Sequence, residues 1–190
     1  MMPTSGKFSI FATVGTDFHQ FDRLIAWVDE WGSGRNDVEC LVQHGMSSPP
    51  ARSAGVDFLS REELTVVLAQ CDVIVCHGGP ATIAEARGAG RLPICVPRDP
   101  VFKEHVDGHQ QRFARRVAQD DLVVLVESKA ALFAALDRAR VRPEAFLLPG
   151  SSGSSGSTDL PPAVDRAGVL IAQLLERSST GPGLPDARRR

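Results

Sequence analysis

The sequence predicts an α/β protein with a Rossmann-like, mostly parallel sheet and helices on both faces. One observation is that strand-like and helix-like segments alternate from residue 8 to residue 139, as in consecutive right-handed βαβ units. Another is the segment from Cys71 to Glu85, where a continuous apolar run leads into a glycine turn and then a helix. Such a run is typical of a strand that is buried on both faces. Ligands of these sheets bind beyond the carboxyl ends of the strands, so a site is expected there.

Local patterns place the elements of the first half. The helix after the first strand has an apolar stripe from Phe18 to Val28, with Asp17 as a plausible N-cap. Ser60 and Glu63 match a capping box ahead of the next helix. The expected order is a strand at 8–14, a helix from 17 that ends at the glycines 32 and 34, a strand at 38–43, a loop at 44–50, a short strand at 55–59 and a helix from 60.

The second half begins with the apolar strand at 73–75. Gly78 and Gly79 give the following turn its backbone freedom, and Pro80 suits the first turn of a helix that ends at residues 88–90. The remaining expected elements are a strand at 92–96, a helix that Asp107 can cap, a strand at 122–126, a helix at 128–139 and an amphipathic helix at 162–177.

We divide the chain into four parts by composition. Residues 1–149 form the Rossmann-like domain, and residues 150–160 form a flexible linker rich in glycine and serine. An amphipathic helix is expected at 161–178. Residues 179–190 end in three arginines and are expected to be a disordered basic tail.

The composition is that of an ordinary globular protein, with 43% hydrophobic and 23% charged residues. A formal charge of −2 gives no sign of nucleic-acid binding, so no nucleic acid is expected as a partner. No apolar stretch approaches the ~20 residues that span a bilayer, and the N-terminus does not resemble a signal peptide. The cysteines have neither metal-ligand nor CxxC spacing, which indicates reduced, buried thiols in a cytosolic protein: Cys40, Cys71, Cys76 and Cys95.

The turn and helix from His77 to Glu85 indicate a ligand site. Backbone N–H groups at such a turn can bind an anion, and the helix dipole favours it. Thr82 and Glu85 lie within one helical turn, so both side chains can reach the same place. Like charges repel, so the carboxylate suits ribose hydroxyls better than phosphate, and phosphate beside ribose indicates a nucleotide. The alternative is a tight turn in which Thr82 and Glu85 are only solvated.

Gly15 and Thr16 follow the first strand and are expected at the same edge of the sheet. They can contact a phosphate, but any turn between a strand and a helix can carry one glycine. The GxGxxG fingerprint is absent, because Asp17 and Phe18 follow. The sequence therefore leaves a phosphate contact and a plain turn equally open.

Residues 103–113 bring two histidines and two adjacent glutamines to the start of a helix. His105 and His109 have the spacing of metal ligands on one helical face, but no HExxH pattern and no third ligand of the right type lies nearby in the sequence. We therefore expect no metal at this segment. Glutamine amides both donate and accept hydrogen bonds, which suits sugar hydroxyls, although a Gln-Gln pair at a helix start is commonplace.

With these motifs, residues 8–126 resemble the donor-binding, C-terminal half of the family 28 glycosyltransferases, which have the two-domain GT-B architecture. The matching segments are 82–85, 90–93, 96–97 and 110–111. The resemblance implies that Glu85 binds the ribose, that the glutamines bind the sugar of a UDP-sugar such as UDP-GlcNAc, and that no metal or other cofactor is needed. The candidate donor-binding residues are Gly15, Thr16, His77, Gly78, Gly79, Thr82, Glu85, His109, Gln110 and Gln111.

Complete enzymes of this family place an acceptor domain ahead of the donor domain, whereas the donor domain here starts at residue 8. The chain therefore resembles the catalytic subunit of the family's two-chain UDP-GlcNAc transferases and its bacterial exopolysaccharide counterparts. This implies an inverting transferase that moves a hexose or N-acetylhexosamine onto a lipid-linked saccharide. A membrane-anchored acceptor-binding subunit would be its partner, at the cytoplasmic face of the membrane.

The resemblance leaves the general base unassigned. His19 and Asp17 lie on a suitable loop, although capping is the simpler role for Asp17. One alternative function is a non-catalytic subunit that binds a nucleotide-sugar and stimulates a separate transferase. A sugar-nucleotide epimerase of the GT-B fold is disfavoured, because such enzymes need both domains in one chain.

Overall fold

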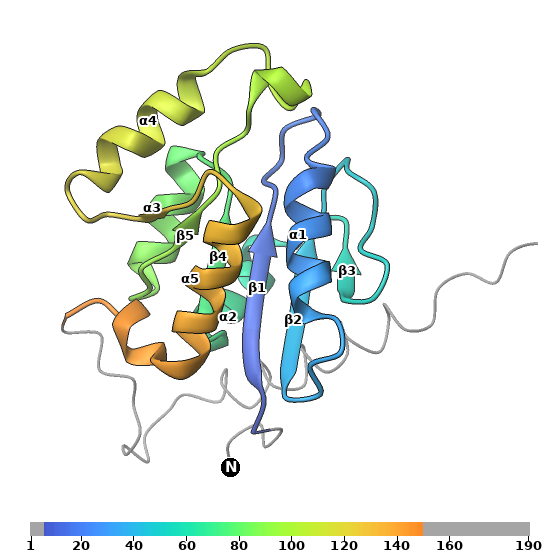
Figure 1. Ribbon diagram of the computed structural model, residues 1–190, viewed down its shortest axis with the longest axis vertical. Helices are drawn as coiled ribbons and strands as arrows, with labels where there is room; N and C mark the ends of the chain where they lie inside the picture. The colour runs from blue at the N-terminus through green and yellow to red at the C-terminus, as the bar shows by residue number, and fades with distance from the viewer. Residues whose placement is uncertain (1–5, 150–190) are drawn as a thin grey trace, which may run out of the picture.

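Six parallel strands form one sheet within residues 6–149, the part of the chain that the computed structural model describes (Figure 1). The strand order is β3-β2-β1-β4-β5-β6, with every neighbouring pair parallel. This confirms the Rossmann-like sheet. The linker at 150–160, the helix at 161–178 and the tail at 179–190 lie outside the described residues. The strands are β1 (Phe8–Thr13), β2 (Val38–Gln43), β3 (Ala54–Val56), β4 (Val73–Cys76), β5 (Ile94–Cys95) and β6 (Val124–Leu125).

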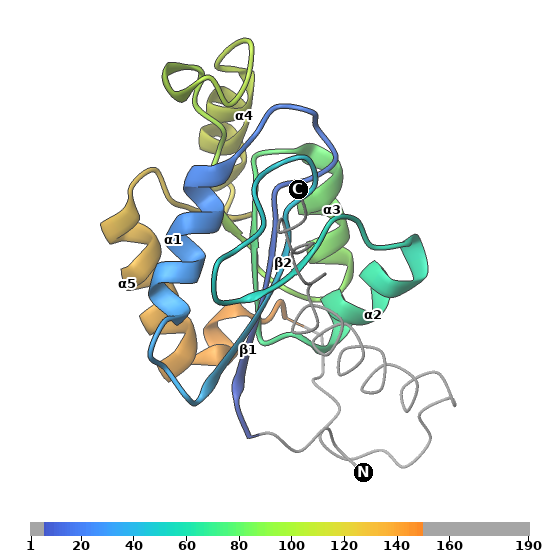
Figure 2. The ribbon, with the colours of Figure 1, turned by 90° about the vertical axis from the view of Figure 1, so that its right-hand side faces the viewer.

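Helices cover both faces of the sheet, as predicted, and each face has its own apolar core (Figure 2). The core under α1 and α5 contains Trp31 and Leu136, and the core under α2, α3 and α4 contains Leu68 and Ile83. Neither face can be left in water, because the central strands are apolar on both sides. The helices are α1 (Asp22–Gly32), α2 (Arg61–Gln70), α3 (Pro80–Gly88), α4 (His109–Ala118) and α5 (Lys129–Val141), with short 3₁₀ turns η1 (Pro100–Phe102) and η2 (Pro143–Phe146).

The starts of α1, α2 and α4 can be compared with the helix caps predicted from the sequence. The capping box of α2 is confirmed, since Ser60 Oγ accepts from the Glu63 N–H and the Glu63 carboxylate accepts from the Ser60 N–H. The prediction that Asp17 caps the first helix is wrong. Its carboxylate accepts from the backbone N–H of His19, and α1 begins only at Asp22. Asp107 does accept from the first N–H of α4, although Gly108 occupies the cap position.

The strand order places a topological switch point between β1 and β4. From β1 the chain proceeds outward to β2 and β3 on one side, and from β4 to β5 and β6 on the other. The loops at the carboxyl ends of β1 and β4 therefore diverge, and ligands of this architecture bind in the crevice at such a point. All four cysteines are buried and free, as predicted. No helix of residues 6–149 has the length and hydrophobicity of a bilayer span.

Candidate functional site

At the switch point, directly after β4, the imidazole of His77 lies between two glycines. A Cβ added at Gly15 would lie 2.4 Å from His77 Cε1, and one added at Gly79 would lie 2.2 Å from His77 Nε2. No side chain other than hydrogen fits either position unless the ring moves. Gly15 also has φ = +77°, a left-handed conformation that favours glycine. Three candidate site residues from the sequence, Gly15, His77 and Gly79, are thus packed together.

His77 is neutral at pH 7. Burial, together with the positive charge of Arg98, lowers its pKa to about 4. Its Nδ1 atom is buried and has no hydrogen-bond partner among residues 6–149. A neutral imidazole can donate one hydrogen bond and accept another, and part of that capacity is unused here.

The N-terminus of α3 opens onto the same turn. Gly79 is its cap residue and Pro80 its first residue, and no side chain within the described chain caps it. No acidic residue lies in its first turn, so its free N–H groups and positive dipole end remain available to an anion. Thr82 is half-buried and Glu85 exposed, and neither side chain has a hydrogen bond or ion pair with residues 6–149.

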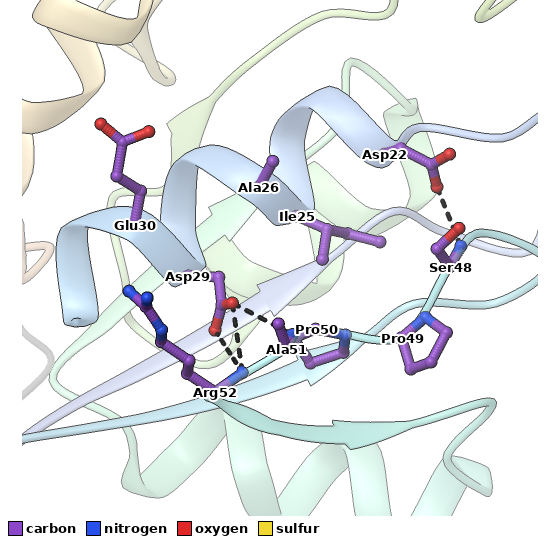
Figure 3. Close-up of a pocket in the computed structure, with 10 residues that line it drawn as sticks. All are labelled: Asp22, Ile25, Ala26, Asp29, Glu30, Ser48, Pro49, Pro50, Ala51 and Arg52. Carbon is purple, nitrogen blue, oxygen red and sulfur yellow. Dashed lines mark hydrogen bonds between the residues drawn. The ribbon is translucent and has the colours of Figure 1, made fainter.

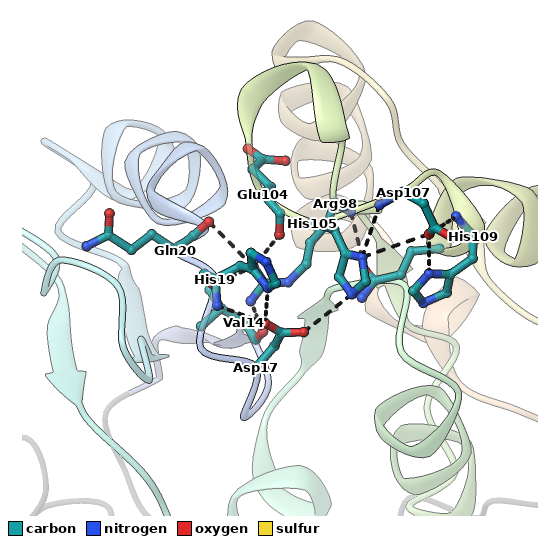
Figure 4. A network of polar contacts seen from close by, with 10 residues as sticks. Val14, Asp17, His19, Gln20, Arg98, Glu104, His105, Asp107 and His109 are labelled. Atoms are coloured by element: carbon teal, nitrogen blue, oxygen red, sulfur yellow. Dashed lines mark hydrogen bonds and ion pairs between the residues drawn. The ribbon is translucent and has the colours of Figure 1, made fainter.

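Arg98, which the sequence analysis missed, joins the loop after β5 to the loop after β1 (Figure 4). It is 0% exposed. Its Nη1 donates to the carbonyl oxygens of His19 at 2.6 Å and Glu104 at 3.0 Å, and its Nη2 donates to that of Val14 at 2.8 Å. An arginine near the end of a strand gives no local sequence signal here, because His19 and Val14, whose carbonyl oxygens it binds, lie 79 and 84 residues away in the sequence.

A second tie fixes the loop after β5 to α1. The Arg23 guanidinium forms two hydrogen bonds of 2.7 Å to the carboxylate of Glu104, which is buried. Glu104 also accepts from the backbone N–H of Asp99 at 2.8 Å. Bidentate pairs of this kind are geometrically specific, so the pair holds the loop in one position.

The candidate sugar-binding residues at the start of α4 face different environments. Gln110 is buried, its Oε1 accepts from the backbone N–H of Arg98 at 3.4 Å, and its Cβ lies against Gly78. Gln111 is half-exposed and His109 is exposed. Gln111 and His109 are therefore accessible to a ligand, whereas Gln110 anchors the loop to the turn at Gly78.

Histidines and aspartates from the two loops form one cluster (Figure 4). The Asp17 carboxylate lies 2.6 Å from His19 Nδ1 and 3.4 Å from His105 Nε2. The sequence spacing offered no third metal ligand beside His105 and His109. In the folded chain, however, Asp17 and His19 come to His105 from another loop.

A depression elsewhere on the surface does not coincide with this site. It lies between α1 and residues 48–52, and contains none of the candidate residues (Figure 3). Its buried acid, Asp29, accepts hydrogen bonds from the backbone N–H groups of residues 51, 52 and 53. The Asp29 carboxylate therefore connects residues 51–53 to α1, and these hydrogen bonds make it unavailable to a ligand.

Comparisons with known proteins agree on the architecture. The family model of the glycosyltransferase family 28 C-terminal domain matches residues 9–159. A relative from Nitrosomonas eutropha (strain DSM 101675 / C91 / Nm57) is 38% identical over 64 residues, which are 34% of this chain and 17% of the relative. Its name is UDP-N-acetylglucosamine--N-acetylmuramyl-(pentapeptide) pyrophosphoryl-undecaprenol N-acetylglucosamine transferase.

Solved structures share the fold at low identity. MurG from Acinetobacter baumannii has a TM-score of 0.54 at 16% identity, with 92% of this chain and 51% of that chain covered. The calicheamicin glycosyltransferase CalG4 has a TM-score of 0.57 at 15% identity, with 94% and 40% covered. The glycotransferase of kitacinnamycin has a TM-score of 0.56 at 17% identity, with 94% and 41% covered. The chain thus spans about half or less of the length of each.

Proposed function

Because the chain belongs to the family of glycosyltransferase family 28 C-terminal domains, we propose that it is the donor-binding catalytic half of an inverting transferase that uses a UDP-sugar. The observation that carries the proposal is the uncapped N-terminus of α3 above the neutral His77, at the switch point of the sheet. The donor named for the Nitrosomonas eutropha relative, UDP-N-acetylglucosamine, supports a uridine nucleotide carrying a hexose or N-acetylhexosamine.

The donor is proposed to lie across the crevice from α3 to α4. Its diphosphate would sit against the N–H groups of the first turn of α3, with Gly15 and Thr16 on the other side. The carboxylate of Glu85, which has no partner within residues 6–149, would accept hydrogen bonds from the ribose hydroxyls, with Thr82 one turn before it. His109 and Gln111 would contact the sugar, while Gln110 and Gly78 hold the loop that presents them.

Catalysis in this proposal depends on stabilising the departing UDP. Negative charge grows on the diphosphate as the bond to the sugar breaks, and the positive end of the α3 dipole would be oriented towards it. The neutral His77 can add a hydrogen bond without a change of protonation. The N-terminus of α3 and His77 would stabilise the charge of the diphosphate directly. The proposal therefore includes no metal ion between the protein and the diphosphate.

The acceptor and the general base are proposed to come from a second chain. A membrane-anchored subunit that binds the lipid-linked saccharide would complete the cleft and hold this chain at the cytoplasmic face of the membrane. The alternative function is an accessory subunit, which binds the same nucleotide-sugar but leaves the transfer to another protein.

Titration of UDP into the purified chain tests the donor site. We expect Glu85→Ala to weaken UDP binding by at least about tenfold, since it removes hydrogen bonds to a charged group. The matched control is Glu62→Ala, because Glu62 is an exposed glutamate in a helix outside the crevice. Equal UDP affinity in both variants, with unchanged thermal unfolding, would refute the assignment of Glu85.

Transfer assays with the partner chain separate the two functions. If this chain is catalytic, Glu85→Ala and Gln111→Ala lower the rate of sugar transfer in step with donor binding. Unchanged transfer by a Glu85→Ala chain that no longer binds UDP would rule out the catalytic role and leave the accessory one.

A further inference from the structure

Three imidazoles and two carboxylates form a continuous row across the loops after β1 and β5 (Figure 4). At one end, the ligand atoms of Asp17, His19 and His105 all lie within 4.8 Å of one another. At the other end, Asp107 Oδ1 lies 3.9 Å from His105 Nδ1 and 2.5 Å from His109 Nδ1. The two loops belong to separate βα units, so the fold and not a local motif assembles the row.

The separation between Asp17 and His105 fits two ligands of one ion. Asp17 Oδ2 and His105 Nε2 lie 3.4 Å apart, which is longer than a good N–H···O hydrogen bond. Two ligands on a tetrahedral zinc ion, with metal–ligand bonds of about 2.0–2.2 Å, lie roughly 3.3–3.5 Å apart. His19 Nδ1 is nearer, 2.6 Å from the other oxygen of Asp17, and it would exchange that hydrogen bond for a metal bond.

We propose that Asp17, His19 and His105 form a binding site for one divalent transition-metal ion of the zinc class. Two histidines and one carboxylate leave coordination positions open for water or an anion. The other ring nitrogen of His105, Nδ1, lies 3.9 Å from the Asp107 carboxylate and accepts from the backbone N–H of Asp107 at 3.5 Å. Arg98 interacts electrostatically with Asp17 and opposes the second positive charge, so we expect micromolar and not nanomolar affinity.

A bound ion would fix the loop after β1 against the loop after β5. Arg98 already connects these loops through the carbonyl oxygens of His19 and Glu104. The ion would connect them a second time through side chains. All three protein ligands come from this chain, so the site does not depend on the proposed transfer reaction.

The test is a titration of Zn²⁺ and Co²⁺ into the untagged, chelator-treated full chain. We expect one equivalent to bind with micromolar affinity, and Co²⁺ to give visible absorption bands of a site with nitrogen and oxygen ligands. His19→Asn and His105→Asn should each weaken binding by at least about tenfold. The matched control is His44→Asn, since His44 also faces an aspartate, Asp57 at 3.2 Å, outside the cluster.

Other outcomes overturn the proposal. The proposal is refuted if neither Zn²⁺ nor Co²⁺ binds stoichiometrically when about 100 equivalents of the ion are added. Binding that His19→Asn leaves intact would also refute it. If His109→Asn abolishes binding while His19→Asn does not, the ion sits on His105, Asp107 and His109 and the assigned ligand set is wrong. Circular dichroism of each variant shows whether it has folded, and the two single variants on different loops test the site independently.

Discussion

The Arg98 guanidinium donates to the carbonyl oxygen of Val14 at 2.8 Å and so connects the end of β1 to the loop after β5. The same side chain reaches His19 and Glu104, so a single buried cation orders both loops beside the switch point. Burial lowers its pKa from the usual arginine range, while the charges of Asp17 and Glu104 act in the opposite direction. The positions of the site loops therefore depend on a residue that is not itself exposed to a ligand.

Arg98→Met should destabilise the protein by about 3 kcal/mol or more, because it removes the donors from several buried carbonyl oxygens and a cation beside two carboxylates. Arg98→Lys keeps the charge but not the planar fork, so its loss should be intermediate. Urea denaturation of the three proteins measures the free energy of unfolding. A loss below about 1 kcal/mol for Arg98→Met would show that the loops are held by other contacts.

Gly15→Ala should cost more than Gly34→Ala, although both glycines have φ = +77°. A Cβ at Gly34 meets nothing within 4 Å, so that variant bears only the cost of the left-handed backbone, about 1–2 kcal/mol. A Cβ at Gly15 also collides with the His77 ring, which adds about 1–3 kcal/mol.

The double variant Gly15→Ala/His77→Ala isolates that collision. If the ring causes the excess cost, the double variant loses less free energy of unfolding than the sum of the two single variants. Strict additivity in thermal or urea unfolding would mean that the ring and residue 15 do not interact. Gly34→Ala combined with His77→Ala provides the additive reference.

His77 predicts a pH dependence of stability. Its pKa is about 4 in the folded chain and about 6.5 in the unfolded chain. Between these values the unfolded chain binds a proton that the folded chain does not, so the free energy of unfolding rises with pH across this window. Stability is accordingly lost as pH falls from 6.5 towards 4, by roughly 3 kcal/mol at most from this residue.

His77→Gln should flatten that part of the pH profile. Urea denaturation at pH 4.5, 5.5, 6.5 and 7.5, chosen to span the roughly 4-to-6.5 window, gives the profile for both proteins. Subtracting one profile from the other removes the contribution of the histidines that both proteins retain. Identical slopes between pH 4.5 and 6.5 would contradict a buried, neutral His77.

The sequence predicted the architecture because its signals are local and periodic. The apolar run at Val73 to Val75 can be satisfied only by burial on both faces, and Ser60 caps its helix within four residues. What it could not show are contacts that depend on packing between distant loops. Asp17 was assigned to a cap because nothing in its neighbourhood revealed His105. Arg98 gave no signal because Val14 and His19, whose carbonyl oxygens it binds, lie in the distant loop after β1.

The glutamine pair shows the same limit and yields a last prediction. Gln110 and Gln111 are adjacent and chemically identical, so the sequence assigned them one role, but Gln110 is 5% exposed and bonded to the Arg98 backbone. Gln111→Ala should therefore keep the free energy of unfolding and the UDP affinity, and reduce only the extra affinity for UDP-GlcNAc over UDP. Gln110→Ala should lose about 1 kcal/mol of stability and weaken both ligands, because the loop loses its anchor. Calorimetric titration of UDP and UDP-GlcNAc into both variants measures these affinities. If Gln110→Ala, and not Gln111→Ala, selectively loses affinity for UDP-GlcNAc, the buried amide of Gln110 contacts the sugar and the prediction is wrong.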